Sequence, residues 1–494
     1  MTSHPSHPVL VASNRGPVSF SLGPEGELTA RRGGGGMVSG LSSALSAAGA
    51  TSGPGALWVC AAMSDADRAA AARGVAAGEP DEVPVLMLDI PAATFEAAYN
   101  GIANSVLWFV HHLLYDTPNQ PLFGQAFRAE WAAYTAYNEA FATALAEHVT
   151  KLGVGPEPGD DSGGARVLIQ DYHLALAPRQ LRDLRPDARI AHFSHTPWAP
   201  PAYFRLLPDD VARDLLDGML GADHLGFLAR RWADGFLDCC AEVLGADVDR
   251  AASTVTWRGR ATRVAVHPLG VDAGALRERA GRDDVRAHAA ALRSQQGGRQ
   301  LIVRVDRTEL SKNIVRGFAA FAEFLAGHPE WHEKVTHLAF AYPSRSGVPE
   351  YQAYTESVRQ TAEAVNARFA TPGWQPIVVE VKDDYARSLA ACSIADVLLI
   401  NPIRDGMNLV AEEGPILSEH GCALVLSREA GAAALIGDHS LLVNPYDVSA
   451  TAAALYEALV MPGAERRQRS AQIAAAAATV APARWLDAQL AGLG

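Results

Sequence analysis

Short apolar segments alternate with amphipathic stretches along almost the whole chain, and this alternation constrains the fold more than any other feature. The segments expected to form strands are residues 9–12, 167–169, 190–193, 264–266, 301–303, 337–340, 377–381, 397–400, 423–426 and 441–443. The stretches expected to form helices include residues 131–151, 209–219, 229–244, 314–327 and 351–369. Strands separated by helices predict parallel sheets covered on both faces, so the expected fold class is α/β.

Two domains are expected, because the 494 residues exceed the roughly 100–200 residues of a typical domain. The polar stretch 272–298 ends in Gln-Gln-Gly-Gly, which is typical of a linker, and a new strand–helix series starts at residue 301. We therefore predict a first domain of residues 1–272 and a second of residues 273–475, with a C-terminal helix, residues 476–494, packing back on the first. Ligands of open α/β sheets bind beyond the carboxyl ends of the strands, so we expect the site in a cleft between two facing domains.

The charge balance argues against a nucleic-acid partner. The chain has 42 basic and 55 acidic residues and a formal net charge of −13, whereas a nucleic-acid-binding protein is usually basic. An acidic protein can still hold a phosphorylated ligand where cations gather locally. Small-molecule substrates are therefore the expected partners.

Cysteine usage and hydropathy indicate a cytoplasmic protein. The five cysteines form no CxxC pair, which disfavours a disulfide framework or a zinc knuckle. Residues 1–8 lack a signal-peptide pattern, and no apolar run approaches the ~18 residues of a membrane span. We expect no membrane partner and, because two-fold dimers are the commonest soluble assembly, a homodimer. No HExxH or Cys/His spacing calls for a metal cofactor, although a divalent metal is left open.

A run of four glycines, residues 33–36, follows Arg31 and Arg32 and leads into a helical stretch. Glycine lets backbone N–H groups approach a ligand closely, and a helix N-terminus favours an anion. The P-loop pattern GxxxxGK[ST] is absent. We interpret the run as a ligand-binding loop, with a flexible surface loop as the alternative.

Arg307 and Lys312 stand five positions apart where a βα turn should follow the strand at 301–303. Arginine donates forked hydrogen bonds and lysine adds a point charge, so the pair could neutralise a diphosphate. The chain has only four lysines, which makes one inside a motif informative. The alternative is a solvated basic loop.

A second polar segment follows the predicted strand at 397–400. Gly406 allows a tight turn, and a helix starting near Asn408 would direct its amides at an anion. Asp405 could accept hydrogen bonds from sugar hydroxyls, and Glu413, further along the helix, could reach a ribose. The alternative role for Asp405 is ordinary helix capping.

Polar residues also follow two predicted strands in the first half of the chain. Gln170, Asp171 and His173 follow residues 167–169, and His195 follows residues 190–193. Parallel sheets display their chemistry just beyond strand ends. A buried structural histidine is the alternative for either ring.

Nine motifs together resemble the trehalose-6-phosphate synthase family of retaining glycosyltransferases. Their order and spacing are specific, and the resemblance covers the chain from Ser13 to about Trp485. The resemblance implies the GT-B architecture, in which two Rossmann-like, doubly wound domains face each other across a cleft. The motifs are SNR (13–15), GGMVSGL (35–41), YNGIANSVLW (99–108), DYHL (171–174), SHTPW (194–198), RTELSKN (307–313), PSRSGV (343–348), RDGMNLVAEE (404–413) and VNPYD (443–447).

The resemblance implies a role for each matching residue on the donor side. The donor diphosphate would lie on Arg307 and Lys312, and its ribose on Glu413. Asp405 would hold the donor ring, and the loop containing Gly35 and Gly36 would close over the donor. The remaining donor contacts would come from the backbone amides of Gly406, Met407, Asn408 and Leu409.

On the acceptor side, the resemblance implies a phosphate pocket made by Arg15, Tyr99, Trp108 and Arg345. His195 would contact the donor ring and Asp171 the reacting pair. The reaction implied uses no protein nucleophile: the departing diphosphate itself deprotonates the acceptor, on the same face from which it leaves. The protein then contributes position and charge stabilisation, through Arg307, Lys312, Asp171, His195 and Asp405.

The sequence departs from the family at the walls around the acceptor ring and in parts of the donor loop. Gln170 replaces the first histidine of HDYHL, Glu309 occupies an aspartate position, and Asn313 replaces the glycine of the same motif. Ala61 stands where a tryptophan is usual. This pattern suggests the same reaction geometry on altered substrates.

The chain also resembles the pseudoglycosyltransferases of this family. That resemblance implies a coupling of GDP-valienol to validamine 7-phosphate through a C–N bond with retained configuration, as in validamycin-type antibiotic biosynthesis. GDP would be a product, and no further cofactor is required. The alternatives are a trehalose-6-phosphate synthase that transfers glucose from GDP- or UDP-glucose to glucose 6-phosphate, and a non-catalytic sugar-nucleotide sensor.

Overall fold

A computed structural model describes residues 9–23, 26–32, 41, 45, 57–73, 83–151, 165–345 and 347–493. The chain divides into two compact units, one of residues 1–269 with 482–494 and one of residues 270–481. The sequence placed these divisions at residues 272 and 476, so each lies within six positions of the structural one. Within the described residues, no helix has both the length and the apolar character needed to cross a membrane.

The first unit is built on a sheet that, among the described residues, has nine strands in the order β5-β4-β1-β6-β7-β8-β11-β10-β9. Neighbours from β5 to β11 run parallel. Their bounds are Val9–Ala12 (β1), Leu57–Ala61 (β4), Val85–Leu88 (β5), Arg166–Gln170 (β6), Arg189–Ser194 (β7), His224–Phe227 (β8), Asp247–Asp249 (β9), Thr254–Trp257 (β10) and Arg260–Val266 (β11).

The edge of this sheet departs from the predicted all-parallel arrangement. Strands β9, β10 and β11 pair antiparallel. Arg258 and Gly259 form the two-residue turn between β10 and β11, and both have positive φ, 51° and 76°. Such a turn matches the twist of a hairpin, but arginine at its first position is a weak sequence signal. A separate hairpin joins β2 (Val18–Leu22) to β3 (Leu28–Arg32).

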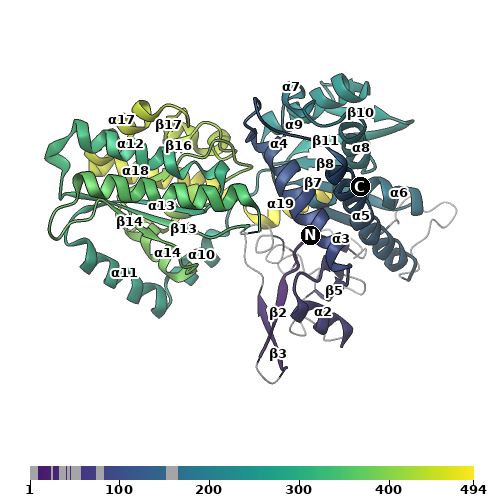
Figure 1. Ribbon diagram of the computed structural model, residues 1–494, viewed down its shortest axis with the longest axis horizontal. Helices are drawn as coiled ribbons and strands as arrows, with labels where there is room; N and C mark the ends of the chain where they lie inside the picture. The colour runs from purple at the N-terminus through teal and green to yellow at the C-terminus, as the bar shows by residue number, and fades with distance from the viewer. Residues whose placement is uncertain are drawn as a thin grey trace, which may run out of the picture. The chain divides into compact units, whose positions relative to one another are not determined.

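Apart from α19, the helices of the first unit lie between these strands in the chain (Figure 1). They include α2 (Asp65–Ala72), α3 (Ala92–Glu96), a π-helix (Ala97–Leu107), α4 (Trp108–His112), α5 (Gln125–Lys151), α6 (Ala177–Leu184), α7 (Pro201–Phe204), α8 (Asp209–Met219), α9 (Arg230–Cys239), a second π-helix (Cys240–Leu244) and α19 (Pro482–Ala491). Helix α19 returns to this unit after the second is complete. Its Trp485 is buried and meets the ring of Phe193 edge-on at 5.0 Å.

The second unit has a parallel sheet that, among the described residues, comprises six strands in the order β14-β13-β12-β15-β16-β17. Their bounds are Gln300–Arg307 (β12), Val335–Tyr342 (β13), Ile377–Glu380 (β14), Val397–Ile400 (β15), Ala423–Ser427 (β16) and Leu441–Val443 (β17). The order reverses between β12 and β15, as in doubly wound folds.

Helices cover both faces of this second sheet (Figure 1). On one side α12 (Ile314–Gly327) packs against α13 (Pro349–Phe369) and α17 (Val448–Val460). On the other side α14 (Tyr385–Ile394) packs against α11 (Asp283–Gln296) and α15 (Val410–Leu417), and α15 packs against α10 (Ala273–Ala280) and α18 (Gly463–Ala478).

The interpretation of residues 272–298 as a linker is wrong. This stretch forms α10 and α11, and α11 packs against α14. Val285, Ala289 and Leu292 are buried, and their spacing of four and three residues places them on one face of α11. The apolar stripe is narrow and the residues beside it are charged. The polar composition therefore suggested a linker where the second unit has a helix.

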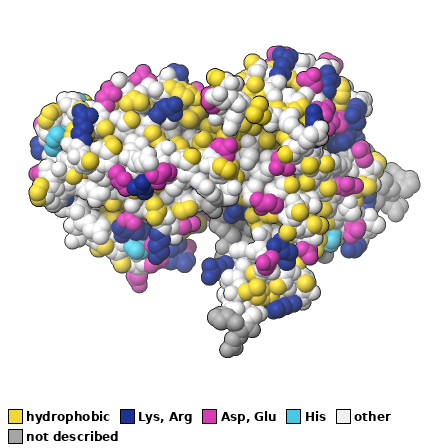
Figure 2. Space-filling view, viewed as in Figure 1, with side chains coloured by type: hydrophobic (Ala, Val, Ile, Leu, Met, Phe, Trp, Pro, Cys, Tyr) yellow, Lys and Arg dark blue, Asp and Glu magenta, His cyan; other side chains and the backbone are white. Residues whose placement is uncertain are grey.

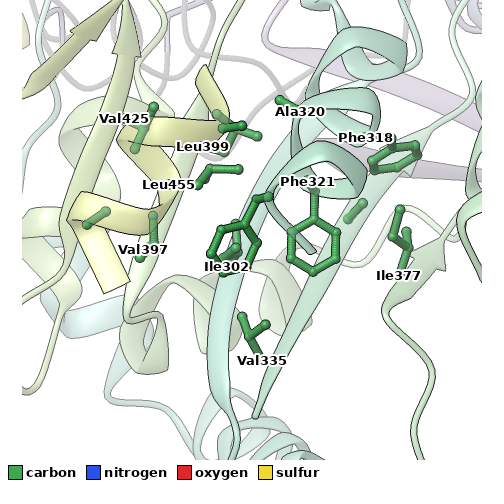
Figure 3. Close-up of a cluster of buried hydrophobic side chains, with 14 of the residues drawn as sticks. Ile302, Phe318, Ala320, Phe321, Val335, Ile377, Val397, Leu399, Val425 and Leu455 are labelled. Atoms are coloured by element: carbon green, nitrogen blue, oxygen red, sulfur yellow. The ribbon is translucent and has the colours of Figure 1, made fainter. Parts of the chain in front are cut away.

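The core of the second unit forms where one face of α12 meets the sheet. Ile314, Phe318, Phe321 and Leu325 recur every three or four residues and are fully buried. Figure 3 shows the ring of Phe321 between Ile302 and Ile377, and the ring of Phe318 on the side of Ile377, among side chains from the neighbouring strands. This pattern is why the sequence located α12 at its observed bounds.

We predict that Phe321→Ala destabilises the second unit by about 3–5 kcal/mol, because it removes a fully buried ring and leaves a cavity. Urea unfolding followed by circular dichroism measures the loss. Leu122→Ala is the control, because Leu122 is 87% exposed and its truncation should change stability little. An equal effect of both substitutions would contradict the packing described for α12.

A buried carboxyl group on α15 makes the stability depend on pH. Glu412 is fully buried and lies close to Gly270, where an added Cβ would be 3.0 Å from Glu412 Oε2. Burial, with a smaller contribution from Glu413, raises the pKa of Glu412 from its ordinary 4.5 to about 8, although the Val271 amide opposes the shift. The folded state therefore retains a proton that the unfolded chain loses above about pH 4.5.

Because the folded pKa is raised, the contribution of Glu412 to stability falls as the pH rises from about 4.5 to about 8. We predict that Glu412→Gln has a higher free energy of unfolding than the parent across this range, by about a few kcal/mol at the upper end, and a correspondingly higher Tm. Thermal unfolding at pH 5, 6.5 and 8.5 measures the difference. The exposed Glu323→Gln should show no such trend, and a constant Tm difference for Glu412→Gln would refute the assignment.

Candidate active site

Lys312 and Asp405 meet beyond the carboxyl ends of two neighbouring strands of the second unit. Lys312 follows β12 and Asp405 follows β15, which are adjacent at the point where the strand order reverses. Open α/β sheets bind ligands at this position. The Lys312 Nζ atom lies 2.5 Å from Asp405 Oδ2, and both side chains are about 15% exposed. The sequence predicted both residues as site residues but not their ion pair.

The ion pair keeps Lys312 charged. Burial alone would lower the pKa of Lys312, but Asp405, Asp306 and Glu309 outweigh it and raise that pKa. Asn408 donates a further hydrogen bond to Asp405 Oδ2 at 3.0 Å. A charged ammonium group therefore lies beyond the carboxyl ends of β12 and β15, paired directly with Asp405.

The loop from Asp405 to Leu409 is held from below by the backbone of residues 431 and 432. The N–H of Gly431 donates to Asp405 O at 3.1 Å, and the N–H of Ala432 donates to Met407 O at 2.9 Å. A Cβ atom at Gly431 would lie 1.8 Å from Gly406 O, so only glycine fits there. Helix α15 begins after Leu409, without a side-chain cap, so the alternative of Asp405 as that cap is wrong.

Glu413 lies in the first turn of α15, next to Glu412. Burial raises the pKa of Glu413 to about 7. Burial, with a smaller contribution from the charge of Glu413, raises the pKa of Tyr385, at the start of α14, to about 12. A buried carboxyl group can form hydrogen bonds with a sugar hydroxyl. The contact of Glu413 with the donor ribose stays a prediction.

Glu309 contacts two arginine side chains just beyond the carboxyl ends of β12 and β13. Its Oε1 atom lies 3.1 Å from Arg307 Nη1 and 3.4 Å from Arg345 Nη1. The Ser344 hydroxyl donates to the same oxygen at 2.9 Å. Burial would raise the pKa of Glu309, but Arg307, Arg345 and Lys312 together lower it to about 2.

The structure separates the four residues predicted for the acceptor phosphate between the two units. Arg345 belongs to the second unit, whereas Arg15, Tyr99 and Trp108 belong to the first. Arg345 is 7% exposed, has a φ of 46°, and donates to the Tyr351 hydroxyl at 2.6 Å. The predicted acceptor-phosphate role of this set stays a prediction.

Asp171 occupies the reversal point of the first sheet, where β6 lies beside β1. Its φ of 72° and ψ of 169° fall in a region that is essentially restricted to glycine. The Asp171 N–H donates to Phe193 O at 2.7 Å, and Asp171 Oδ1 accepts the His195 N–H at 3.1 Å. Strain of this kind persists where the surroundings fix it, often at functional sites.

His195 and Gln170 are joined side chain to side chain. The His195 Nε2 atom lies 2.9 Å from Gln170 Oε1. Burial, assisted by His192, lowers the pKa of His195 to about 3, so its imidazole is neutral near pH 7. The ring packs 5.5 Å from Trp485 of α19. Gln170, where the sequence departs from the family, therefore sets the partner of a predicted site histidine.

Tyr99 and Trp108 contact consecutive residues of the turn after β6. The Tyr99 ring stacks on His173 at 5.6 Å, and the Trp108 ring lies 5.8 Å from Tyr172. An Arg15 guanidinium nitrogen lies 3.4 Å from the Tyr99 hydroxyl. These residues, predicted from separate motifs, gather around one turn.

The sequence did not identify Asn138 as a support of this turn. The Asn138 Nδ2 atom donates to His173 O, and its Oδ1 accepts the N–H groups of Leu176 and Ala177. Asn138 is fully buried on α5 within the apolar series Tyr134, Phe141 and Leu145. A polar residue inside an apolar helical stripe was the available signal.

Two further predicted features concern the glycine run and Ala61. The glycine run, with Gly35 and Gly36, lies outside the described residues. Ala61 ends β4 and is buried, and its N–H donates to Asn14 O. Among the described residues, no group of three or more His, Cys, Asp or Glu side chains is arranged to hold a metal ion.

Basic and acidic side chains are interspersed on the visible face of each unit (Figure 2). The cations that follow β12, Arg307 and Lys312, are therefore a local feature of an acidic chain. Such an arrangement suits a small phosphorylated ligand better than an extended polyanion.

Known proteins share this fold and these motifs. A validamine 7-phosphate valienyltransferase of Streptomyces hygroscopicus subsp. jinggangensis (strain 5008) is 31% identical over 447 residues, covering 88% of this chain and 85% of that protein. A probable alpha,alpha-trehalose-phosphate synthase (UDP-forming) of Arabidopsis thaliana is 32% identical over 468 residues, or 93% of this chain, but the match spans only 54% of the plant protein.

The same likeness extends to a solved structure. The alpha,alpha-trehalose-phosphate synthase (UDP-forming) from Burkholderia xenovorans, in complex with glucose-6-phosphate, aligns with a TM-score of 0.82 at 26% identity, covering 98% of this chain and 99% of that chain. The model of glycosyltransferase family 20 matches residues 7–493, through both units. The chain therefore belongs to glycosyltransferase family 20 and has the GT-B architecture of two Rossmann-like units.

Proposed function

We propose that this glycosyltransferase is a pseudoglycosyltransferase that couples GDP-valienol to validamine 7-phosphate. The observation that carries the proposal is the Gln170–His195 contact, because a residue that differs from the sugar-transferring pattern directly partners a site histidine. The likeness to a validamine 7-phosphate valienyltransferase, over 88% of this chain and 85% of that protein, supports it. The reaction forms a C–N bond with retained configuration.

The chemistry requires charge stabilisation rather than a protein nucleophile. The bond between the donor carbon and the diphosphate oxygen breaks, and a bond from that carbon to the acceptor nitrogen forms. The acceptor proton passes to the departing diphosphate, so GDP is released. Positive charge on the valienol ring spreads over its double bond, and Lys312 and Arg307 offset the negative charge growing on the leaving group.

The acceptor would be held through its phosphate. Arg15, Tyr99 and Arg345 would each supply hydrogen-bond donors suited to that group. Asp171, fixed in its strained conformation, would position the reacting amine. Neutral His195 would contact the donor ring by hydrogen bonding rather than by charge.

A trehalose-6-phosphate synthase is the second candidate. The likeness to a plant UDP-forming synthase and to a solved synthase with glucose-6-phosphate supports it. Both candidates use the same cations at the edge of β12, so the geometry of Lys312 and Arg307 does not discriminate between them.

A matrix of donors and acceptors, with products identified by mass spectrometry, separates the two candidates. GDP-valienol, GDP-glucose and UDP-glucose are each mixed with validamine 7-phosphate and with glucose 6-phosphate. We expect a nitrogen-bridged phosphorylated product from the cyclitol pair. Trehalose 6-phosphate from a glucose donor, without any cyclitol product, would overturn the proposal.

We predict that Lys312→Ala lowers kcat by about 100-fold or more, because it removes a cation aimed at the leaving diphosphate. Steady-state release of nucleotide measures the loss, and circular dichroism checks the fold. Lys334→Ala is the control, because Lys334 is exposed and lies at the amino end of β13, whereas Lys312 lies beyond the carboxyl end of β12. A kcat for Lys312→Ala within about threefold of the parent would remove Lys312 from the mechanism.

A further inference from the structure

Glu309 lies where two predicted phosphate-binding arginines meet. Strands β12 and β13 pair in parallel with Arg307 opposite Tyr342, and the Thr308 N–H donates to Tyr342 O at 2.6 Å. The residues that follow each strand are therefore neighbours. This register brings Glu309 beside Ser344 and Arg345, although they are far apart in the sequence.

We propose that Glu309 is a positioning residue that couples the donor-diphosphate arginine, Arg307, to the acceptor-phosphate arginine, Arg345. One buried carboxylate oxygen contacts both guanidinium groups, so their relative placement is set by a single side chain. The proposal rests on the proposed function, because the two phosphate roles belong to it.

The burial of Glu309 makes this contact obligatory. A carboxylate removed from water costs much free energy unless cations and hydrogen bonds satisfy it. Glu309 is fully buried, and Arg307, Arg345 and Ser344 surround the same oxygen atom. These partners keep the group ionised, and the ionised group in turn orients them.

The two arginines differ in how much freedom they retain. The Arg307 side chain is 55% exposed, whereas the Arg345 side chain is 7% exposed. Arg345 also has a positive φ and is held by the Tyr351 hydroxyl. Glu309 therefore links an accessible cation, suited to an incoming diphosphate, to a cation that is already fixed. Loss of the charge on Glu309 should disturb both.

The length of the Glu309 side chain also determines whether its carboxylate can contact both guanidinium groups. Aspartate is shorter by one methylene group, so its carboxylate would not contact both guanidinium groups at the distances observed here. Glu309→Asp keeps the charge and changes the placement, whereas Glu309→Gln keeps the size and removes the charge. The two variants therefore separate electrostatics from geometry.

The test is calorimetric binding to the full-length protein, with GDP as the diphosphate probe, glucose 6-phosphate as the sugar-phosphate probe and glucose as the phosphate-free probe. We expect Glu309→Gln to weaken the binding of GDP and of glucose 6-phosphate together, each by about tenfold, because both rely on charge-assisted hydrogen bonds from oriented arginines. Glucose binding should not change. The exposed Glu323→Gln is the control and should change neither Kd.

Single-arginine variants show what uncoupled effects look like. Arg307→Ala should weaken GDP binding more than glucose 6-phosphate binding, and Arg345→Ala should do the reverse. If Glu309→Gln, while folded, weakens only one probe or neither, the coupling is refuted. A fall in Tm with both Kd values unchanged would leave Glu309 a purely structural role and would also refute the coupling.

Two milder variants cover the case in which Glu309→Gln does not fold. Ser344→Ala removes one hydrogen bond to the same oxygen and keeps the charge. It and Glu309→Asp should each shift both Kd values in the same direction, by about two- to threefold. Unchanged values in both variants would refute the proposal.

Failure of the proposed function gives a different result. If the parent binds both probes but transfers nothing between any donor and acceptor, the proposed function fails, and the binding shifts still decide the role of Glu309. If the parent binds neither probe, both proposals fall.

Discussion

The ion pair between Lys312 and Asp405 is the interaction on which the candidate donor site depends. It exists because β12 and β15 are neighbours at the reversal of strand order, so the segments that follow them converge. Burial alone would lower the pKa of Lys312, but Asp405, together with Asp306 and Glu309, raises it and keeps the lysine charged. A diphosphate would then exchange one anionic partner of Lys312 for another, which avoids exposing an uncompensated buried charge.

The first unit follows the same topological rule with different chemistry. Its strand order reverses between β1 and β6, and Arg15 and Asp171 follow those two strands. Asp171 is held in a strained conformation by the backbone of β7 and of His195. Each unit thus places charged residues where its sheet reverses, and the proposed reaction needs no protein nucleophile.

Much of this organisation was predictable from the sequence, and the failures have physical causes. The apolar stripe of α12 set its bounds, because Ile314, Phe318 and Phe321 share one face. The contacts of Lys312 with Asp405 and of Glu309 with Arg345 were not predictable, because they depend on which strands pair. Helices α10 and α11 were not predicted from the sequence, because each buries only a narrow apolar face and charged residues dominate the rest of the helix.

The central claim is that a nucleoside diphosphate binds to Lys312 and Arg307 at the edge of β12. A crystal structure of the protein with GDP tests it directly. We expect a phosphate oxygen within hydrogen-bonding distance of Lys312 Nζ and of the Arg307 guanidinium, with the ribose on Glu413. Phosphates bound elsewhere, with Lys312 still paired only to Asp405, would contradict the account.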